Sequence, residues 1–142
     1  MAMVGVRLTT ALLGMVVAGC VSFGYGSQPG QTSRTVKDGT WGGQHLSMRV
    51  SPASSELEFD CGTGSVEGRI PLDRENAFSV SGTLTREGGP TRLGGTSGQP
   101  MRLTGTVDGD TMKVRIVLTD SDADEGTFTL ALGAEARLVK CR

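Results

Sequence analysis

The sequence predicts an all-β fold, most simply a small eight-stranded antiparallel up-and-down barrel. Apolar and polar residues alternate in one segment after another, as they do in strands with one buried face. Glycine is abundant, with 22 in 142 residues, and after the first 20 residues the apolar spacing of an amphipathic helix is absent. Eight antiparallel strands can close on themselves and remove their exposed edges. A β-sandwich of the same strands is the alternative.

Turn signals separate the expected strands. The Gly-Thr-Trp sequence at 39–41 opens the first strand, and Asp-Gly-Asp at 108–110 predicts a tight hairpin. Gly68, Gly82 and Gly105 fall at inward positions, where a missing side chain permits sharp coiling of the sheet. The apolar stripes of the eight strands are expected at 46–50, 57–61, 66–70, 78–84, 101–107, 112–118, 128–132 and 137–141.

The N-terminus has the layout of a secretory signal. Arg7 precedes an apolar stretch at 8–19 that is too short to span a bilayer as a permanent helix. The closing Val-Ala-Gly-Cys at 17–20 resembles the bacterial lipobox. This resemblance implies that Cys20 receives a diacylglycerol, that the chain is cut before it, and that the new N-terminus is acylated. The protein would then be lipid-anchored in the cell envelope.

Composition divides the rest of the chain. We expect a signal peptide with a cleaved helix at 1–19, a lipidated cysteine with a flexible tether at 20–37, and a β-barrel domain at 38–142. The tether is rich in Gly, Ser, Gln and Pro and has no apolar period. Val21 in place of Asp resembles outer-membrane sorting, which in a Gram-negative cell places the domain in the periplasm.

Three cysteines are present, and Cys20 is assigned to the lipid. An even pair in an exported domain predicts a disulfide between Cys61 and Cys141. Closing that loop would stabilise the fold by roughly 4 kcal/mol on the chain-entropy model. Two free thiols held for metal or redox chemistry are the alternative.

The Gly-x-Trp at 39–41 resembles the opening of the lipocalin and calycin barrels. In that family the Trp closes the narrow end of the barrel and stacks on a basic side chain from the last strand. The resemblance makes Arg137, Lys140 and Arg142 candidate partners of Trp41. Separately, we expect contacts with a ligand or a protein partner from Trp41, Gln44, His45, Arg92 and Leu93, the last two in the loop at 87–100.

Two further resemblances concern the whole domain. The segments at 39–45, 57–61, 107–112, 127–130 and 138–141 look like those of uncharacterised bacterial lipoproteins with a small calycin-like barrel. The anchor, barrel and long-range cysteine pair also resemble the periplasmic membrane-bound inhibitors of C-type lysozyme. Those inhibitors carry a Ser-Gly-x-x-Tyr loop. This chain has Ser-Gly at 81–82 but Thr85 where the Tyr would be, so the motif is absent.

Two acidic segments resemble functional sites but have simpler explanations as solvent-exposed surface. Asp120, Asp122 and Asp124 match the first positions of a calcium loop, although its later Gly and Glu are missing. This run is a weak calcium candidate, and a solvated hairpin tip explains it equally. The carboxylates at 56, 58 and 60 alternate on one strand and are expected to face solvent. The segment at 87–100 is long for a loop, which predicts either a partner-binding flap or disorder.

Together these patterns favour a non-catalytic envelope protein. It would bind a small apolar ligand in the barrel or a protein partner through the 87–100 loop. A filled, purely structural or stress-related barrel and a lysozyme-inhibitor-like protein are the alternatives. His45 is the single histidine, so an enzyme is not expected, and neither is a cofactor. The near-neutral charge, 14 basic against 15 acidic residues, argues against nucleic acid as a partner. An internal apolar cavity would favour the ligand-binding function, and a filled interior would favour the structural one. The expected lining of such a cavity is Met48, Phe59, Val80, Leu103, Val114 and Leu130.

Overall fold

The computed structural model describes residues 34–87 and 98–141. The predicted signal peptide, Cys20 and most of the tether therefore lie outside the described residues, as do Arg92 and Leu93 of the expected loop.

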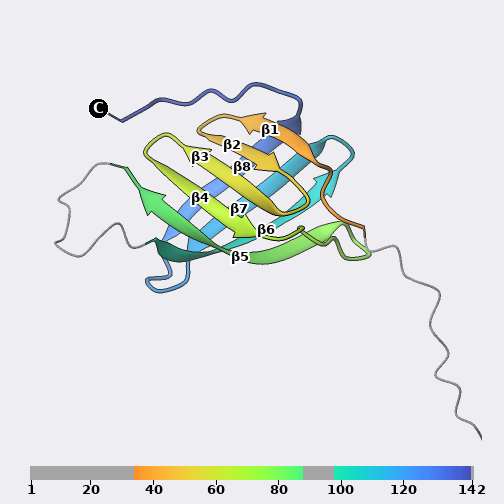
Figure 1. The fold of residues 1–142 in the computed structure, drawn as a ribbon, viewed down its shortest axis with the longest axis horizontal. Helices are drawn as coiled ribbons and strands as arrows, with labels where there is room; N and C mark the ends of the chain where they lie inside the picture. The colour runs from red at the N-terminus through yellow and green to blue at the C-terminus, as the bar shows by residue number, and fades with distance from the viewer. Residues whose placement is uncertain (1–33, 88–97, 142) are drawn as a thin grey trace, which may run out of the picture. The chain divides into compact units, whose positions relative to one another are not determined.

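The described chain is an all-β, closed antiparallel barrel in which each strand pairs with its sequence neighbours (Figure 1). Pairing of the first strand with the last closes the ring, through Trp41 with Leu132 and Gly43 with Leu130. The predicted up-and-down barrel is confirmed, and the sandwich alternative is wrong. The strands are β1 (Gly39–Gly43), β2 (Leu46–Val50), β3 (Ser54–Phe59), β4 (Gly62–Glu67), β5 (Ala77–Arg86), β6 (Gln99–Asp108), β7 (Thr111–Leu118) and β8 (Asp124–Leu132).

The count of eight is correct, but two strands differ from the prediction. The expected first strand is two strands, because the chain turns at Gln44 and His45, where His45 has a φ of 67°. The segment at 137–141 does not form a strand. It makes one isolated bridge, between Gln44 and Arg137. The long loop consequently connects β5 to β6, not the fourth strand to the fifth.

The fourth strand also begins earlier than expected. The Gly-Thr-Gly-Ser sequence at 62–65 falls between the expected strands at 57–61 and 66–70, but it lies in β4 and pairs with both β3 and β5. Gly64 faces the interior, where a Cβ would lie 2.9 Å from the Cε of Met101. Gly68, expected inside a strand, follows β4 with a φ of 74° and ends it. Gly64 thus allows close packing inside the barrel, and Gly68 allows the turn that ends β4.

Side chains fill the barrel where its inner surface carries glycine. The methyl group of Met101 lies between Gly64 and Gly82, and a Cβ on Gly82 would be 3.0 Å from it. A Cβ on Gly105 would be 2.7 Å from Cζ of Phe78. Of the expected cavity lining, Phe59 and Val80 are partly buried and pack against the core. The other four members are fully buried within it: Met48, Leu103, Val114 and Leu130.

The chain before β1 belongs to the barrel. Val36 is part of the buried core and donates its backbone N–H to the carbonyl of Ile70 at 3.0 Å. Thr35 forms a bridge with Pro71. Residues 34–37, which composition assigns to the tether, thus extend the packed domain toward the N-terminus. Lys37 adds an exposed ion pair with Asp110, at 2.7 Å, on the β6–β7 turn.

Trp41 is fully buried and points into the core. Its indole N–H donates to the carbonyl of Lys37 at 3.1 Å, so the polar end of the ring is satisfied. Across residues 34–87 and 98–141 the structure has no cation–π contact, so neither Arg137 nor Lys140 takes the expected place on the ring. Arg142 lies outside the described residues.

The filled interior predicts that Gly105→Ala destabilises the barrel. The new methyl group would press on Phe78 and on the backbone of Lys113, which should lower the free energy of unfolding by about 1–3 kcal/mol. Urea denaturation measures this. Thr104→Ala, at the exposed neighbouring position, is the control and should cost less than about 1 kcal/mol. Equal stability of the two variants would mean that this layer of the barrel contains unfilled space.

Candidate functional site at the mouth of the barrel

One end of the barrel brings together the side chains that could bind a ligand or take part in a reaction. The β1–β2 turn at 44–45 and the β3–β4 turn at 60–61 lie at this end, since both follow strands that run the same way. The end of β5 and the start of β8 are there as well. We call this end the mouth.

The last residues, 134–141, run outside β1 toward the mouth, and we call them the strap. Figure 1 shows them in dark blue, beside β1 and leading to the C-terminus. Gly42 lies against the backbone of Ala134 and Ala136, where any Cβ would overlap the strap. Arg137 then exchanges two backbone hydrogen bonds with β1 and its turn: it donates to Gly43 and accepts from His45, each at 2.9 Å.

Asp60 is the point where the strap, the β1–β2 turn and the β3–β4 turn meet. Its Oδ1 accepts the backbone N–H of Val139 at 2.7 Å, and its backbone carbonyl accepts the N–H of Cys141 at 3.3 Å. Its Oδ2 accepts from Nδ1 of His45 at 2.5 Å. A carboxylate only accepts, so Nδ1 carries the proton and Nε2 is the second nitrogen that a ligand can reach. Beside these groups Lys140 pairs with Glu58 at 2.6 Å.

These contacts change the acidity of the groups that make them. The hydrogen bond from Val139 does most to hold the pKa of Asp60 below its usual value, and His45 and Lys140 act in the same direction against partial desolvation. The hydrogen bond to Glu58 raises the pKa of Lys140. Asp60 therefore stays ionised through the neutral range and keeps the strap and His45 attached.

Cys61 and Cys141 lie within disulfide distance, with Cα atoms 5.2 Å apart. The predicted pairing is thus present in the structure, 80 residues apart in sequence. It joins the β3–β4 turn to the end of the strap, not to a final strand as expected. Cys141 is exposed and Cys61 is half-buried.

A hollow of about 350 Å³ opens at the mouth. The rings of Phe59 and Phe128 meet edge to face in it, with centroids 6.1 Å apart. Two ion pairs stand beside the rings, His45 with Asp60 and Arg86 with Glu125. The hollow is lined by His45, Phe59, Asp60, Cys61, Gly62, Leu84, Arg86, Glu125 and Phe128.

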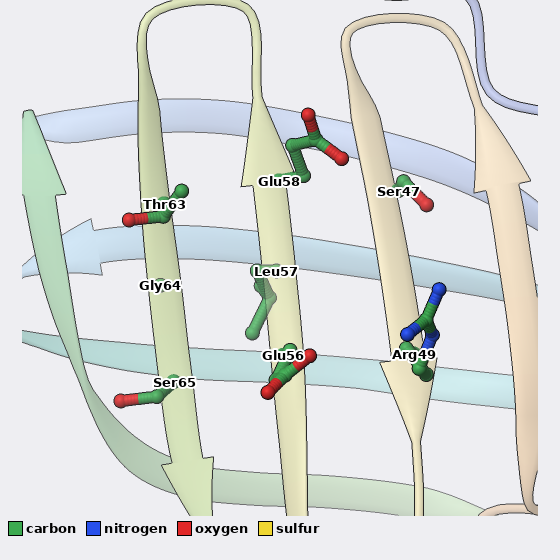
Figure 2. Close-up of a pocket in the computed structure, with 8 residues that line it drawn as sticks. All are labelled: Ser47, Arg49, Glu56, Leu57, Glu58, Thr63, Gly64 and Ser65. Atoms are coloured by element: carbon green, nitrogen blue, oxygen red, sulfur yellow. The ribbon is translucent and has the colours of Figure 1, made fainter. Parts of the chain in front are cut away.

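A second hollow lies on the outer face of the barrel, over β2, β3 and β4 (Figure 2). Arg49 stands opposite Glu56, and Ser47 opposite Glu58, on neighbouring strands. Its volume is about 460 Å³. Both glutamates are exposed, as the alternation predicted. The lining combines charges of both signs with hydroxyl groups and one apolar side chain, Leu57.

The structure brings only part of the predicted contact set to the mouth. His45 lines the mouth hollow, whereas Trp41 is buried in the core. Gln44 bridges to Arg137 of the strap. Arg92 and Leu93 lie outside the described residues.

Of the calcium-loop candidates after β7, Asp124 is engaged by protein groups. Arg115 donates to Oδ2 of Asp124 at 2.8 Å and 3.0 Å, and the N–H of Gly126 donates to its Oδ1. The Arg115 contact is the main cause that lowers the pKa of Asp124. Asp122 has a φ of 55° in the exposed turn. Among residues 34–87 and 98–141, no three acidic, histidine or cysteine side chains gather as a metal site would require.

The segment compared with the lysozyme-inhibitor loop is not a loop. Residues 81–85 lie within β5, and Leu84 is buried in the core. Ser81 to Leu84 pair with β6, and Thr83 to Thr85 pair with β4. This segment cannot extend into another protein's active site without breaking the barrel.

Comparisons with known proteins found no matching family model, no matching curated protein and no matching solved structure. In the part of the chain that the structure describes, no helix is long and apolar enough to cross a membrane.

Sequence reasoning missed the pairing of His45 with Asp60 and assigned Asp60 only to an outer face. The available signal was that His45 directly precedes the stripe at 46–50 and Asp60 lies near the end of the stripe at 57–61. The start of one strand and the end of the next lie at the same end of an up-and-down barrel. Reading that signal requires the split at 44–45, which the alternation alone does not reveal.

The contacts of Asp60 predict a local transition in acid. A group whose folded pKa is lowered stabilises the fold above its unfolded pKa, here 3.8, and this contribution is lost as the pH falls through the lowered folded value. We expect the amide proton of Val139 to shift below about pH 4 in NMR titrations. Asp60→Asn should remove that transition. If the amide of Val139 titrates in the same way in the variant, Asp60 does not hold the strap.

Proposed function

We propose that this protein is a non-catalytic, lipid-anchored cell-envelope protein that binds a small amphipathic ligand at the mouth of its barrel. The observation that carries this proposal is the mouth hollow, in which the rings of Phe59 and Phe128 stand beside two ion pairs. A surface that combines aromatic area with a few polar groups is typical of small-molecule sites.

The packing of the core decides where such a ligand would lie. Met101 and Phe78 fill the space left by the inward glycines, so a ligand in the centre of the barrel would have to displace side chains. The mouth hollow, at about 350 Å³, is near the small end of the range for ligand pockets, about 300–1,000 Å³. We therefore place the ligand at the mouth and expect it to be small.

The lining limits the chemistry of this ligand. The aromatic rings and Leu84 offer apolar contact, and His45 offers a ring nitrogen whose orientation Asp60 fixes. Each charged group of the rim already has a partner of opposite sign. A ligand with a ring or short alkyl part and one or two neutral hydrogen-bonding groups fits this lining best.

The same arrangement favours binding over catalysis. A His–Asp pair orients an imidazole as in hydrolases, but such a site also needs a nucleophile and donors for a developing charge. The hollow is lined by no serine or threonine, and its cysteine is in the disulfide. His45 is thus proposed as a ligand-orienting residue.

The anchor part of the proposal rests on the lipobox resemblance at 17–20. The packed chain enters the barrel through residues 34–38, at the end that carries the β6–β7 turn. Strand direction places this turn opposite the mouth. A tether to a membrane from that end leaves the mouth accessible to the surrounding compartment.

A second candidate is a structural envelope lipoprotein, and the filled interior is the observation that favours it. In that case the barrel is a rigid support and the mouth hollow stays solvated. Inhibition of lysozyme is less favoured, because residues 81–85 are committed to β5.

Ligand binding is tested with the full chain purified from its own cells. We expect native mass spectrometry to show a retained small molecule. Anilinonaphthalene sulfonate serves as a fluorescent probe of the hollow. Phe128→Ala should weaken its binding about tenfold, equivalent to about 1.4 kcal/mol, because the ring supplies much of the apolar contact.

Leu72→Ala is the matched control, since Leu72 is also a partly buried residue against the core but lies in the β4–β5 connection at the other end. It should change probe affinity less than twofold. Equal affinity of the two variants, together with an empty native protein, would favour the structural candidate.

The anchor is tested by Cys20→Ser. We expect the wild-type protein to have the mass of a chain beginning at residue 20 plus its lipid and acyl groups, and to fractionate with membranes. The variant should lack both the added mass and the membrane fraction. Ser22→Ala, two residues away, is the control and should behave as wild type. A wild-type mass equal to that of the unmodified 142-residue chain would contradict the lipobox interpretation.

A further inference from the structure

In the described residues the strap bonds to the rim of the mouth and to β1, with further contacts from Ala134 to β8 and from Lys140 to β3. Three residues that line the mouth hollow are bonded to the strap. His45 is hydrogen-bonded to Arg137, and Asp60 to Val139 and Cys141. Cys61 forms the disulfide with Cys141. The β1–β2 turn and the β3–β4 turn are thus held together through a segment that is not part of the barrel wall.

The strap has no apolar anchor of its own. None of residues 134–141 belongs to the hydrophobic core: Ala134, Ala136 and Leu138 are only half-buried, and Val139 is 67% exposed. Apart from the disulfide, its attachments near the C-terminus are single exposed hydrogen bonds and the exposed ion pair of Lys140 with Glu58. Exposed contacts of this kind contribute little against the entropy of an ordered chain end.

The barrel itself does not depend on the strap. Its ring is closed by the pairing of β1 with β8, and the core consists of residues from Val36 to Leu130. Loss of the strap would leave every strand pair in place. The disulfide therefore controls a peripheral segment and, through it, the two turns that form the rim.

We propose that the Cys61–Cys141 disulfide is a redox latch that keeps the strap on the rim and thereby holds the mouth hollow in its binding geometry. The latch opens with a dithiol reductant. The effect of the latch on ligand binding rests on the proposed function. The opening of the strap does not depend on that proposal.

The direction of the exchange reaction follows from the burial of the two residues, since Cys141 is exposed and Cys61 is half-buried. One thiolate of the dithiol attacks Sγ of Cys141, and Cys61 leaves as a thiolate that takes up a proton. The second thiol of the reductant then displaces Cys141 from the mixed disulfide. Two electrons and two protons pass to the protein, which ends with two thiols, and the reductant ends as a disulfide.

The opening of the strap is tested by hydrogen exchange with mass spectrometry on the full chain, before and after treatment with dithiothreitol. We expect the hydrogen-bonded amides of Arg137, Val139, Cys141 and His45 to exchange at least tenfold faster after reduction. Amides in β6 and β7 serve as the internal reference and should keep their protection. The Cys141→Ser variant should show the fast exchange without any reductant.

Two results would overturn the latch. Unchanged protection of residues 137–141 after complete reduction would show that the strap is held by its other contacts. Loss of protection throughout β6 and β7 would show that the disulfide holds the whole fold and not a local segment.

Coupling to the ligand site is tested separately with anilinonaphthalene sulfonate. We expect reduction to weaken probe binding at least fivefold, because the rim turns become free to move apart. Unchanged affinity after the strap has opened would refute the coupling. Absence of probe binding to the oxidised protein would refute the proposed function, while the exchange experiment would still decide whether the strap opens.

Discussion

The pairing of β1 with β8 is the interaction on which the rest of the structure depends. It turns eight strands into a closed ring, so every inward side chain is surrounded by others and no sheet edge is left unpaired among these strands. β1 can lie this close to its neighbours because of two adjacent glycines. The backbone of Thr129 and the side chain of Leu130 pack directly against Gly43, where a Cβ would overlap them. The strap packs in the same way against Gly42.

Closure also determines where chemistry is available. In this small ring Met101 and Phe78 occupy the space beside the inward glycines and Trp41 is fully buried, so the polar groups that can act are at its ends. The turns at 44–45 and 60–61 place His45 beside Asp60, and the strap fixes both. A rigid scaffold with a modest, less stable rim is an arrangement in which a binding site can be adjusted without disturbing the fold.

The sequence anticipated the fold well because period-two alternation is a local signal that survives in nearly every strand, most clearly at 112–118. It failed where the backbone decided the outcome. The split at 44–45 depends on a positive φ at His45, a non-glycine residue, and the strand at 62–65 depends on glycines that allow close contact with β5. The His45–Asp60 contact joins two turns and leaves no mark in either local pattern.

By itself the sequence determined the all-β class and the exposed positions of Glu56 and Glu58, since alternation is a property of the chain. It also paired Cys61 with Cys141, once Cys20 is assigned to the lipid. Only the tertiary structure decided that the barrel is filled, that Trp41 bonds to Lys37, and that 137–141 is a strap bonded to Asp60. These outcomes depend on side-chain volumes meeting across a closed ring and on distant backbone groups finding partners, which no local pattern encodes.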